Sequence, residues 1–553
     1  MSKNLSELSG RKGLQHNLFE ALQKTATEKG TPSVEEMENL ADEFLMGKAN
    51  LYGTATFYDF LKPENAGKKV YVCNGSACLT AGTQQQLTSE LQTCFPDNEI
   101  GNMCCLGRCH ENNAFHYNGA NYSGKDIERL SDILQGSVQL SDNYHVGASG
   151  AGLLTAPFPG IAAFYQTWRE ALTKTPQLLL EELKTSGLRG RGGAGFPTAF
   201  KLEACRNTHG RQKFIVCNAD EGDPGAYSDR YLLEERPHLV LLGMMLAGYM
   251  AGANWGVLYI RAEYPQSVAI MQQEIAKLEQ LGLLGDNILH SGFNFHFKVV
   301  KAQGAYICGE ETALLSSIEG QRPEVRVRPP YPTQQGLFNR PTVVNNVETL
   351  ACVPFIVANG GKAFAGIGKG KSTGTKLLSL DGFFNRPGLY EVDMGTPLQA
   401  VVNELGMGFK EPVKALHIGG PLGGLVPVHK IPDLTIDFES FAQNGFLLGH
   451  ASVVCLPQHF PVIQYLEHLF EFTAHESCGK CFPCRLGSVR GFELLNKART
   501  SDYKIDKTLF SDLIETLETG SLCALGGGLP LPVKNALQYF ENELNPFFSA
   551  LAL

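Results

Sequence analysis

The chain has 553 residues, of which 43% are hydrophobic and 19% are charged, and its formal net charge is -9. A chain of this length exceeds what one hydrophobic core supports, so we expect three or four domains. The acidic balance argues against a nucleic-acid-binding protein, because such proteins usually carry a basic surface.

The first residues, MSKNLSELSGRKG, lack the apolar stretch of a secretory signal peptide. With fifteen cysteines in the chain, this predicts a cytoplasmic protein whose clustered thiols bind metal instead of forming disulfides. Residues 238–261 are long enough to span a bilayer, but glycines and polar residues interrupt them at 252–256. We therefore expect a buried helix followed by a buried strand, and no insertion into a membrane.

Sequence patterns divide the chain into five segments. Residues 1–140 combine a helical stretch with alternating strand and helix patterns. Residues 141–175 are expected to form a linker, because the stretch SVQLSDNYHVGASGAG at its start is rich in Gly and Ser. Residues 176–372 carry an α/β pattern, residues 373–445 are typical of a small β-rich domain, and residues 446–553 of a helical bundle.

The first cysteine cluster contains two pairs. Four residues separate Cys73 from Cys78, and three separate Cys105 from Cys109. Thiolates suit both iron–sulfur clusters and zinc, and pairs at these wider spacings are typical of a two-iron cluster. Zinc is the alternative for this site, and Cys104 could take the place of Cys105.

The second cluster is a run in the sequence HESCGKCFPCRLG, where two residues separate Cys478 from Cys481 and two separate Cys481 from Cys484. Cys523 is the only cysteine that follows, so it is the best candidate for a fourth ligand. Three closely spaced ligands and one distant one are typical of a four-iron cluster. Zinc is again the alternative.

A glycine-rich loop begins the α/β segment, with the sequence GLRGRGGAGFPTAFK at 187–201. Glycines let backbone N–H groups approach an anion, and the following helix adds the positive end of its dipole. Arg189, Arg191 and Lys201 supply positive charge, so we expect a phosphate cradle. The loop matches neither a Rossmann G-x-G-x-x-G turn nor a Walker A loop, and a merely flexible loop is the alternative.

Three further stretches carry groups that suit a ligand other than phosphate. Asn218, Asp220, Glu221 and Asp223 follow the short strand FIV at 214–216, where α/β sheets bind ligands. Glu310 and Glu311 lie at a helix start, where the alternative is that they cap the helix. The stretch PTVVNNVETLA adds amide and hydroxyl groups suited to a flavin edge or a phosphate, from Asn345, Asn346 and Thr349.

Six motifs in order, GLRGRGGAGFPT, CNADEGDPG, GAYICGEETAL, PTVVNNVETL, ESCGKCFPC and GSLCALGGG, resemble the flavin-bearing NADH-oxidising subunit of respiratory NADH dehydrogenase. The resemblance covers about residues 176 to 553. The N-terminal 140 residues resemble the thioredoxin-like two-iron subunit of the same enzymes, through LYGTATFYDFL, VCNGSAC and CCLGRC. Fusion of the two is typical of diaphorase subunits of soluble hydrogenases and formate dehydrogenases.

The resemblance implies a multidomain α/β fold: a thioredoxin-like N-terminal domain, a Rossmann-like FMN and NAD domain, a β-grasp-like domain and a C-terminal helical bundle. It implies a [2Fe-2S] cluster held by Cys73, Cys78, Cys105 and Cys109, and a [4Fe-4S] cluster held by Cys478, Cys481, Cys484 and Cys523. It places around FMN the residues Gly190, Arg191, Gly192, Gly193, Lys201, Asn218, Asp220, Glu221, Gly309, Glu310, Glu311, Asn345, Asn346 and Thr349. It places near NAD(H) the residues Phe196, Lys201, Asp223 and Tyr306.

The implied activity is that of an NADH:acceptor oxidoreductase, with hydride transfer between NAD(H) and FMN and single-electron transfer through the four-iron cluster. Glu310 and Lys201 are the expected catalytic residues, and Asp223 is expected to favour NADH over NADPH by repelling a 2′-phosphate. The expected partners are an iron–sulfur relay subunit and the catalytic subunit of a hydrogenase or formate dehydrogenase. The alternatives are the NADH-oxidising subunit of a quinone-reducing respiratory complex and a non-catalytic electron-relay subunit.

Overall fold

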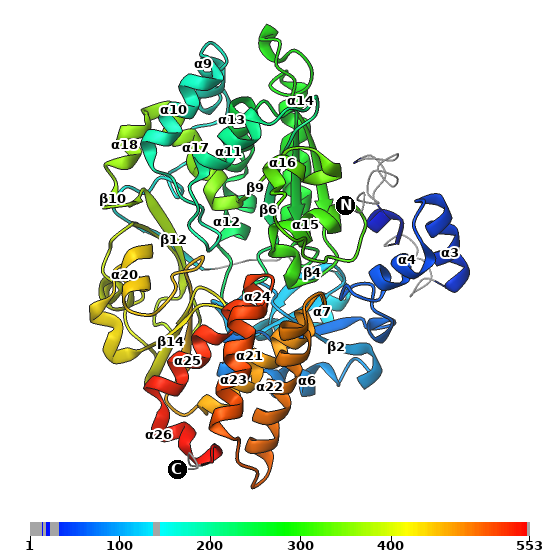
Figure 1. Ribbon diagram of the computed structural model, residues 1–553, viewed down its shortest axis with the longest axis vertical. Coiled ribbons are helices and arrows are strands. Elements are labelled where there is room, and N and C mark those ends of the chain that lie inside the picture. The colour runs from blue at the N-terminus through cyan, green and yellow to red at the C-terminus, as the bar shows by residue number, and fades with distance from the viewer. Residues whose placement is uncertain (1–13, 15–17, 23–32, 137–143, 550–553) are drawn as a thin grey trace.

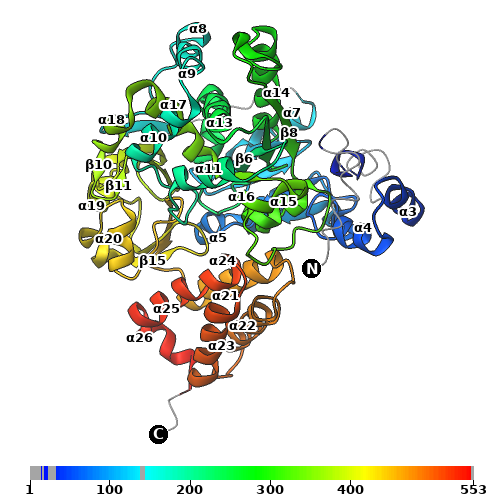
Figure 2. The same cartoon turned by 45° about the horizontal axis from the view of Figure 1, so that its top comes forward.

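The computed structural model describes residue 14 and residues 18–22, 33–136 and 144–549. The chain folds into α/β layers with a separate group of C-terminal helices at one end (Figures 1 and 2). This arrangement confirms the expected fold class, with an α/β layer in each predicted α/β segment and a helical C-terminal region. Among the described residues, no helix has the length and apolarity needed to cross a bilayer.

The N-terminal region begins with a helical arm, α3 (Val34–Glu43) and α4 (Lys48–Ala55). Ser33 and Glu36 form a capping box that starts α3. A four-stranded sheet in the order β2-β1-β3-β4 follows, in which β1 and β2 are parallel and the other pairs antiparallel. Its elements are β1 (Val70–Cys73), α5 (Ser76–Ala81), α6 (Gln84–Leu91), β2 (Ile100–Met103), β3 (Ala114–Tyr117), β4 (Ala120–Ser123) and α7 (Leu130–Leu134).

The central domain contains a wholly parallel sheet in the order β8-β7-β6-β9. Its strands are β6 (Phe214–Ala219), β7 (Trp255–Ile260), β8 (His296–Lys301) and β9 (Thr342–Asn346). The helices around it are α10 (Pro176–Ser186), α11 (Thr198–Asn207), α12 (Ser228–Glu235), α13 (Pro237–Ala251), α14 (Pro265–Gln280), α15 (Glu311–Ile318), α16 (Pro332–Gln335), α17 (Val347–Asn359) and α18 (Gly361–Ala365). The apolar run at 238–261 forms the buried helix α13 and the buried strand β7, as the sequence predicts.

The third sheet has six strands in the order β15-β14-β16-β12-β13-β5. Its strands are β5 (His145–Ser149), β12 (Thr375–Leu380), β13 (Gly388–Asp393), β14 (Val413–Ile418), β15 (Gly424–Pro427) and β16 (Ser452–Pro457). Helices α19 (Leu398–Ala400) and α20 (Phe438–Gln443) and the short strands β10 (Gly368–Lys369) and β11 (Ser372–Thr373) lie near it. Strand β16 lies beyond the expected boundary at 445 and continues the sheet.

The segment 141–175 differs from the expected linker wherever it is described. Strand β5 pairs in parallel with β13, and α8 (Ile161–Phe164) and α9 (Gln166–Ala171) follow it. The buried carboxylate of Glu391 accepts hydrogen bonds from the backbone N–H groups of Leu153, Leu154 and Thr155. Because β5 is an edge strand with mostly exposed side chains, its sequence carries no alternating apolar pattern.

The C-terminal helices are α21 (Val462–Glu476), α22 (Phe482–Thr500), α23 (Lys507–Gly520), α24 (Ala524–Gly528), α25 (Pro530–Tyr539) and α26 (Glu541–Leu544). Helices α21 and α22 pack closely, since a side chain at Gly491 would collide with the ring of Phe470. The loop between these two helices carries Cys478 and Cys481, and Cys484 lies in the first turn of α22.

Candidate active site and metal centres

The glycine-rich loop connects α10 to α11 and is fastened to its surroundings by Arg191. The Arg191 backbone N–H donates to Thr349 Oγ1 over 2.8 Å, and its Nη2 donates to the Thr373 carbonyl over 2.5 Å. The loop also lies close to the start of α17, because a Cβ at Gly192 would lie 2.9 Å from Asn346 Cβ. Arg191 is 1% exposed, and its Nε and Nη1 have no hydrogen-bond partner among the described residues. A buried cation with two unsatisfied donors fits a phosphate group.

Two more unsatisfied groups lie at the carboxyl ends of the adjacent strands β6 and β9. Asp220 and Asn345 are both buried, and Asp220 Oδ2 and Asn345 Nδ2 have no partner within the described part of the chain. Burial raises the pKa of Asp220 well above its usual value. An acceptor and a donor at this edge suit the polar rim of a planar cofactor such as a flavin, so the donor set fits the expected FMN.

Several other residues expected at this site have partners within the protein. Asn218 Nδ2 donates to the Gly309 carbonyl over 2.8 Å, and Asn346 caps α17 and donates to Asp229. Glu221 is buried, and its carboxylate accepts hydrogen bonds from the backbone of Asp229, the Ser228 hydroxyl and the Tyr264 hydroxyl. These groups shape the loops of the site, because their side-chain hydrogen bonds are internal.

Lys201 lies at the rim of the site with two acidic residues. Its Nζ donates to Glu311 Oε2 over 2.9 Å and to the Val344 carbonyl over 3.2 Å, and Arg328 donates to the other oxygen of Glu311. Glu310 Oε2 accepts from the backbone N–H groups of Thr312 and Ala313, so this residue caps α15, as the alternative interpretation held.

An exposed aromatic pair stands next to the glycine loop. Phe196 and Phe200 contact each other edge to face with their ring centroids 5.6 Å apart, and Lys201 Nζ lies 6.0 Å from the Phe196 centroid. Phe200 is 62% exposed and was not among the residues expected from the sequence. The sequence could have indicated Phe200, because it follows Phe196 by four positions at a helix start and residues at this spacing lie side by side.

Asp223 and Tyr306, both expected near the nucleotide, contact each other directly. The Tyr306 hydroxyl donates to Asp223 Oδ1 over 2.6 Å, and His450 Nδ1 lies 2.8 Å from Asp223 Oδ2. Burial is the main cause that raises the pKa of Tyr306, and the Asp223 carboxylate adds to it. His450 follows Asp223 by more than two hundred positions, so no local pattern indicated it.

The first cysteine set comes together in the N-terminal domain. Cys73, Cys78, Cys105 and Cys109 are all buried, and the Sγ atoms of Cys105 and Cys109 are 3.2 Å apart. Contacts with Cys105 and Cys78, together with burial, raise the pKa of Cys73. The backbone N–H of Gly225 donates to Cys109 Sγ over 3.2 Å, so a loop of the central domain reaches this site. The contacts that Cys105 makes with Cys109 and Cys73 favour it over Cys104 as the ligand.

The second cysteine set comes from the loop after α21, the first turn of α22 and the residue before α24. Cys478 and Cys484 are buried, whereas Cys481 and Cys523 are partly exposed. Cys481 is the N-cap of α22 and Cys523 the N-cap of α24. A Cβ at Gly526 would lie 2.7 Å from Cys484 Cβ, so glycine allows α24 to approach the set. Cys523 lies close enough to Cys478 and Cys484 for their charges to contribute to the raised pKa of its thiol, for which burial is the main cause. Thiols gathered in this way suit an iron–sulfur cluster.

Three protein families match successive parts of the chain. Residues 6–137 match the thioredoxin-like [2Fe-2S] ferredoxin family, residues 183–355 the Nuo51 FMN-binding domain, and residues 464–546 the NADH-ubiquinone oxidoreductase-F iron-sulfur binding region. An NADH-quinone oxidoreductase-F protein of Rhizobium meliloti (strain 1021) is 41% identical over 383 residues, which cover 68% of this chain and 91% of that protein. The chain belongs to the NADH-quinone oxidoreductase-F family.

Proteins similar to this member of the oxidoreductase-F family include hydrogenase subunits. The NADP-reducing hydrogenase subunit HndC of Solidesulfovibrio fructosivorans is 41% identical over 382 residues, which cover 68% of this chain and 78% of HndC. A chain in the crystal structure of an NAD+-reducing [NiFe]-hydrogenase in the H2-reduced state has 28% identity and a TM-score of 0.84, with 97% of this chain and 94% of that chain covered.

These comparisons confirm the expected family resemblance and the cofactor set of FMN, [4Fe-4S] and [2Fe-2S], and they fit NAD(H) as the substrate. The chain is an NADH-oxidising flavin and iron–sulfur diaphorase subunit. A non-catalytic relay subunit, the alternative with a degenerate flavin pocket, would be expected to lack the glycine loop or Lys201, and this chain has both.

Proposed function

We propose that this chain is the diaphorase subunit of an enzyme that couples NAD(H) to a hydrogenase reaction. The fusion of the two-iron domain to the flavin domain is the observation that supports this best. In structure, a chain of an NAD+-reducing [NiFe]-hydrogenase aligns with 97% of this chain and so spans both its two-iron and its flavin parts. In sequence, HndC and the Rhizobium meliloti relative each align over 68% of it. Formate dehydrogenase and a quinone-reducing complex are the alternative partners.

Purification of the complex through a tag on this chain tests the proposed partner. A hydrogenase catalytic subunit and an iron–sulfur relay subunit should co-purify, and the complex should reduce NAD+ with H2. Co-purification of a formate dehydrogenase subunit, or of quinone-binding membrane subunits without a hydrogenase subunit, would contradict the proposal.

The unsatisfied polar atoms suggest which residues bind each part of the cofactor. FMN, when bound, supplies a group that exchanges two electrons with a nicotinamide nucleotide and single electrons with iron–sulfur clusters. Arg191 and the backbone of the glycine loop hold the phosphate of the cofactor, and Asp220 and Asn345 orient its polar rim. Glu310 and Lys201 line the same site and fix its electrostatics through Glu311 and Arg328.

The nucleotide binds on the exposed side of this site. The exposed rings of Phe196 and Phe200 offer a stacking surface beside Lys201, and aromatic faces stack on planar bases. Asp223, which accepts a hydrogen bond from Tyr306, favours NADH by repelling a 2′-phosphate.

An apolar strip beside the four-iron cysteines supports an electron exit at this surface. Phe482 and Leu486, one turn apart on α22, are 68% and 58% exposed, and Leu522 precedes the partly exposed Cys523. Exposed apolar residues grouped in this way mark protein interaction sites. We therefore place the contact with the relay subunit at this strip, next to Cys481 and Cys523.

Leu486→Glu tests the exit surface. The variant should retain NADH oxidation with a small artificial acceptor and lose affinity for the relay subunit, because a charge enters an apolar contact. Leu178→Glu on α10 is the matched control, since Leu178 is equally exposed at 58% but lies on the central domain. Equal partner affinity in the two variants would place the contact elsewhere.

A further inference from the structure

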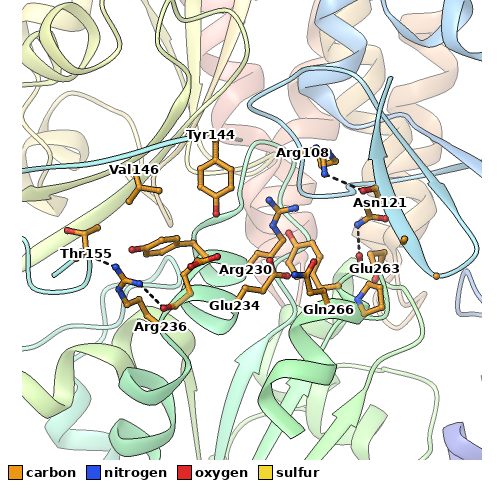
Figure 3. Close-up of a pocket in the computed structure, with 16 residues that line it drawn as sticks. Arg108, Asn121, Tyr144, Val146, Thr155, Arg230, Glu234, Arg236, Glu263 and Gln266 are labelled. Carbon is orange, nitrogen blue, oxygen red and sulfur yellow. Dashed lines mark hydrogen bonds between the residues drawn. The ribbon is translucent and has the colours of Figure 1, made fainter. Parts of the chain in front are cut away.

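The segment Arg261–Tyr264, which follows strand β7, lies on the two-iron loop 104–109. Arg261 Nη2 donates to the Cys104 carbonyl over 3.4 Å. Asn121 Nδ2 donates to the carbonyls of both Leu106 and Glu263, over 3.1 Å and 2.6 Å (Figure 3 shows the second bond). A Cβ at Gly107 would lie 2.6 Å from the Tyr264 hydroxyl oxygen, so the two segments are in close contact.

Arg261 also contacts the flavin side of the molecule. Its Nη1 donates to the carbonyl of Glu221, next to Asp220, and its backbone N–H donates to the Ala219 carbonyl at the end of β6. The guanidinium thus lies between the loop that carries the unsatisfied carboxylate of Asp220 and the loop that carries Cys105 and Cys109. The side chain is 2% exposed, so solvent screens its charge only weakly.

The charge of Arg261 pairs with the carboxylate of Glu263, at 2.7 Å from Nη2 to Oε1. Glu263 is itself 2% exposed, and its Oε2 has no hydrogen-bond partner among the residues that the structure describes. A buried ion pair is weak evidence for stability, because the desolvation of two charges offsets their attraction. Stabilising the fold therefore does not by itself explain why this ion pair is buried here.

The two members of the pair differ in their surroundings. Glu263 lines a cavity of about 1020 Å³, whose walls include Arg108, Tyr144 and Arg230, whereas Arg261 is not among its lining residues (Figure 3). The cavity therefore lies on the Glu263 side of the pair. Arg261 is the member of the pair whose charged group bonds to the two-iron loop, at the Cys104 carbonyl.

We propose that Arg261 is a positioning residue that raises the reduction potential of the two-iron centre, and that Glu263 opposes it. Reduction adds one negative charge to the centre, so a fixed positive charge favours the reduced form and a fixed negative charge disfavours it. The inference rests on the two-iron cluster being held by the first cysteine set.

Redox titrations of the full-length holoprotein, followed by the electron paramagnetic resonance signal of the reduced two-iron cluster, test this. Glu263→Gln should raise the midpoint potential and Arg261→Gln should lower it. Each shift should be on the order of a tenfold change in the one-electron equilibrium, about 59 mV. Arg261→Lys, which keeps the charge, and the double variant Arg261→Gln with Glu263→Gln should both lie nearer to the wild type than Arg261→Gln does.

A merely structural role would not shift the potential in opposite directions for the two single variants. Shifts of the same sign, or no shift in Glu263→Gln, would overturn the proposal. Glu263→Gln is nearly isosteric, so it decides the question even if Arg261→Gln does not fold. Absence of any two-iron signal in the wild-type protein would instead overturn the assignment of the cluster.

Discussion

The Tyr306 hydroxyl donates a 2.6 Å hydrogen bond to the carboxylate of Asp223, which also faces His450 at 2.8 Å. This contact joins the loop after strand β6 to the segment before α15, the two segments between which we propose that the nucleotide binds. It holds a negative charge in one place at the edge of the site, and a fixed charge discriminates between nucleotides better than a mobile one.

Asp223→Asn should narrow the preference for NADH over NADPH. The amide keeps the size of the side chain but removes the repulsion of a 2′-phosphate, and we expect a change of roughly 1–3 kcal/mol in relative transition-state binding. Steady-state kcat/KM for both nucleotides, with ferricyanide as the acceptor, measures it. Tyr306→Phe removes the hydrogen bond and keeps the charge, so it should retain most of the preference. An unchanged ratio in Asp223→Asn would show that the carboxylate only holds its loop in place.

Arg191→Ala should weaken FMN binding. The substitution removes the buried guanidinium whose Nε and Nη1 are unsatisfied by the described residues, and loss of a charged hydrogen bond costs about 1.5–3 kcal/mol, roughly tenfold or more in affinity. Flavin content per chain after dialysis measures the effect. Arg189→Ala is the matched control on the same loop, because Arg189 already pairs with Glu439 and the Gly195 carbonyl. Equal flavin loss in both variants would mean that Arg191 acts only by ordering the loop.

Cys105→Ser should abolish the two-iron signal in electron paramagnetic resonance, whereas Cys104→Ser should leave it. The Sγ atoms of Cys105 and Cys109 are 3.2 Å apart, and Cys105 also contacts Cys73. The reverse outcome would assign the ligand to Cys104.

Gly526→Ala should reduce the occupancy of the four-iron cluster. A Cβ at this position would lie 2.7 Å from Cys484 Cβ and 2.4 Å from Ser521 Oγ, so α24 would have to move away from a ligand. Gly527→Ala is the neighbouring control, since the nearest atoms to its Cβ would be 3.7 Å away or more. Iron content and the four-iron signal should fall only in the first variant, and a comparable loss in both would point to a general effect on the helix.

The sequence was most informative where chemistry depends on local spacing. The C-x2-C-x2-C run and the glycine loop could be identified because their members are close in the chain. Strand β5 was missed because an exposed edge strand is defined by its pairing with β13 and not by its own pattern. Strand β16 lay beyond the expected boundary because an uninterrupted apolar run is compatible with a buried strand or with part of a helix.

Contacts between distant segments explain the other differences at the site. His450 and Arg261 carry no motif, and their importance comes only from the loops that the fold brings next to them. Glu221 belongs to a recognisable motif, yet its carboxylate accepts bonds from the start of α12 and from Tyr264. A sequence pattern can thus indicate that a loop is functional without showing which of its side chains face the ligand.

Anaerobic titration of the purified full-length protein with NADH, followed by visible absorbance, tests the central claim most directly. The account predicts a coloured protein with one FMN and about six irons per chain, from one four-iron and one two-iron cluster. NADH should bleach the flavin absorbance within the mixing time. A colourless protein that contains zinc, or a flavin spectrum that does not change with NADH, would contradict it.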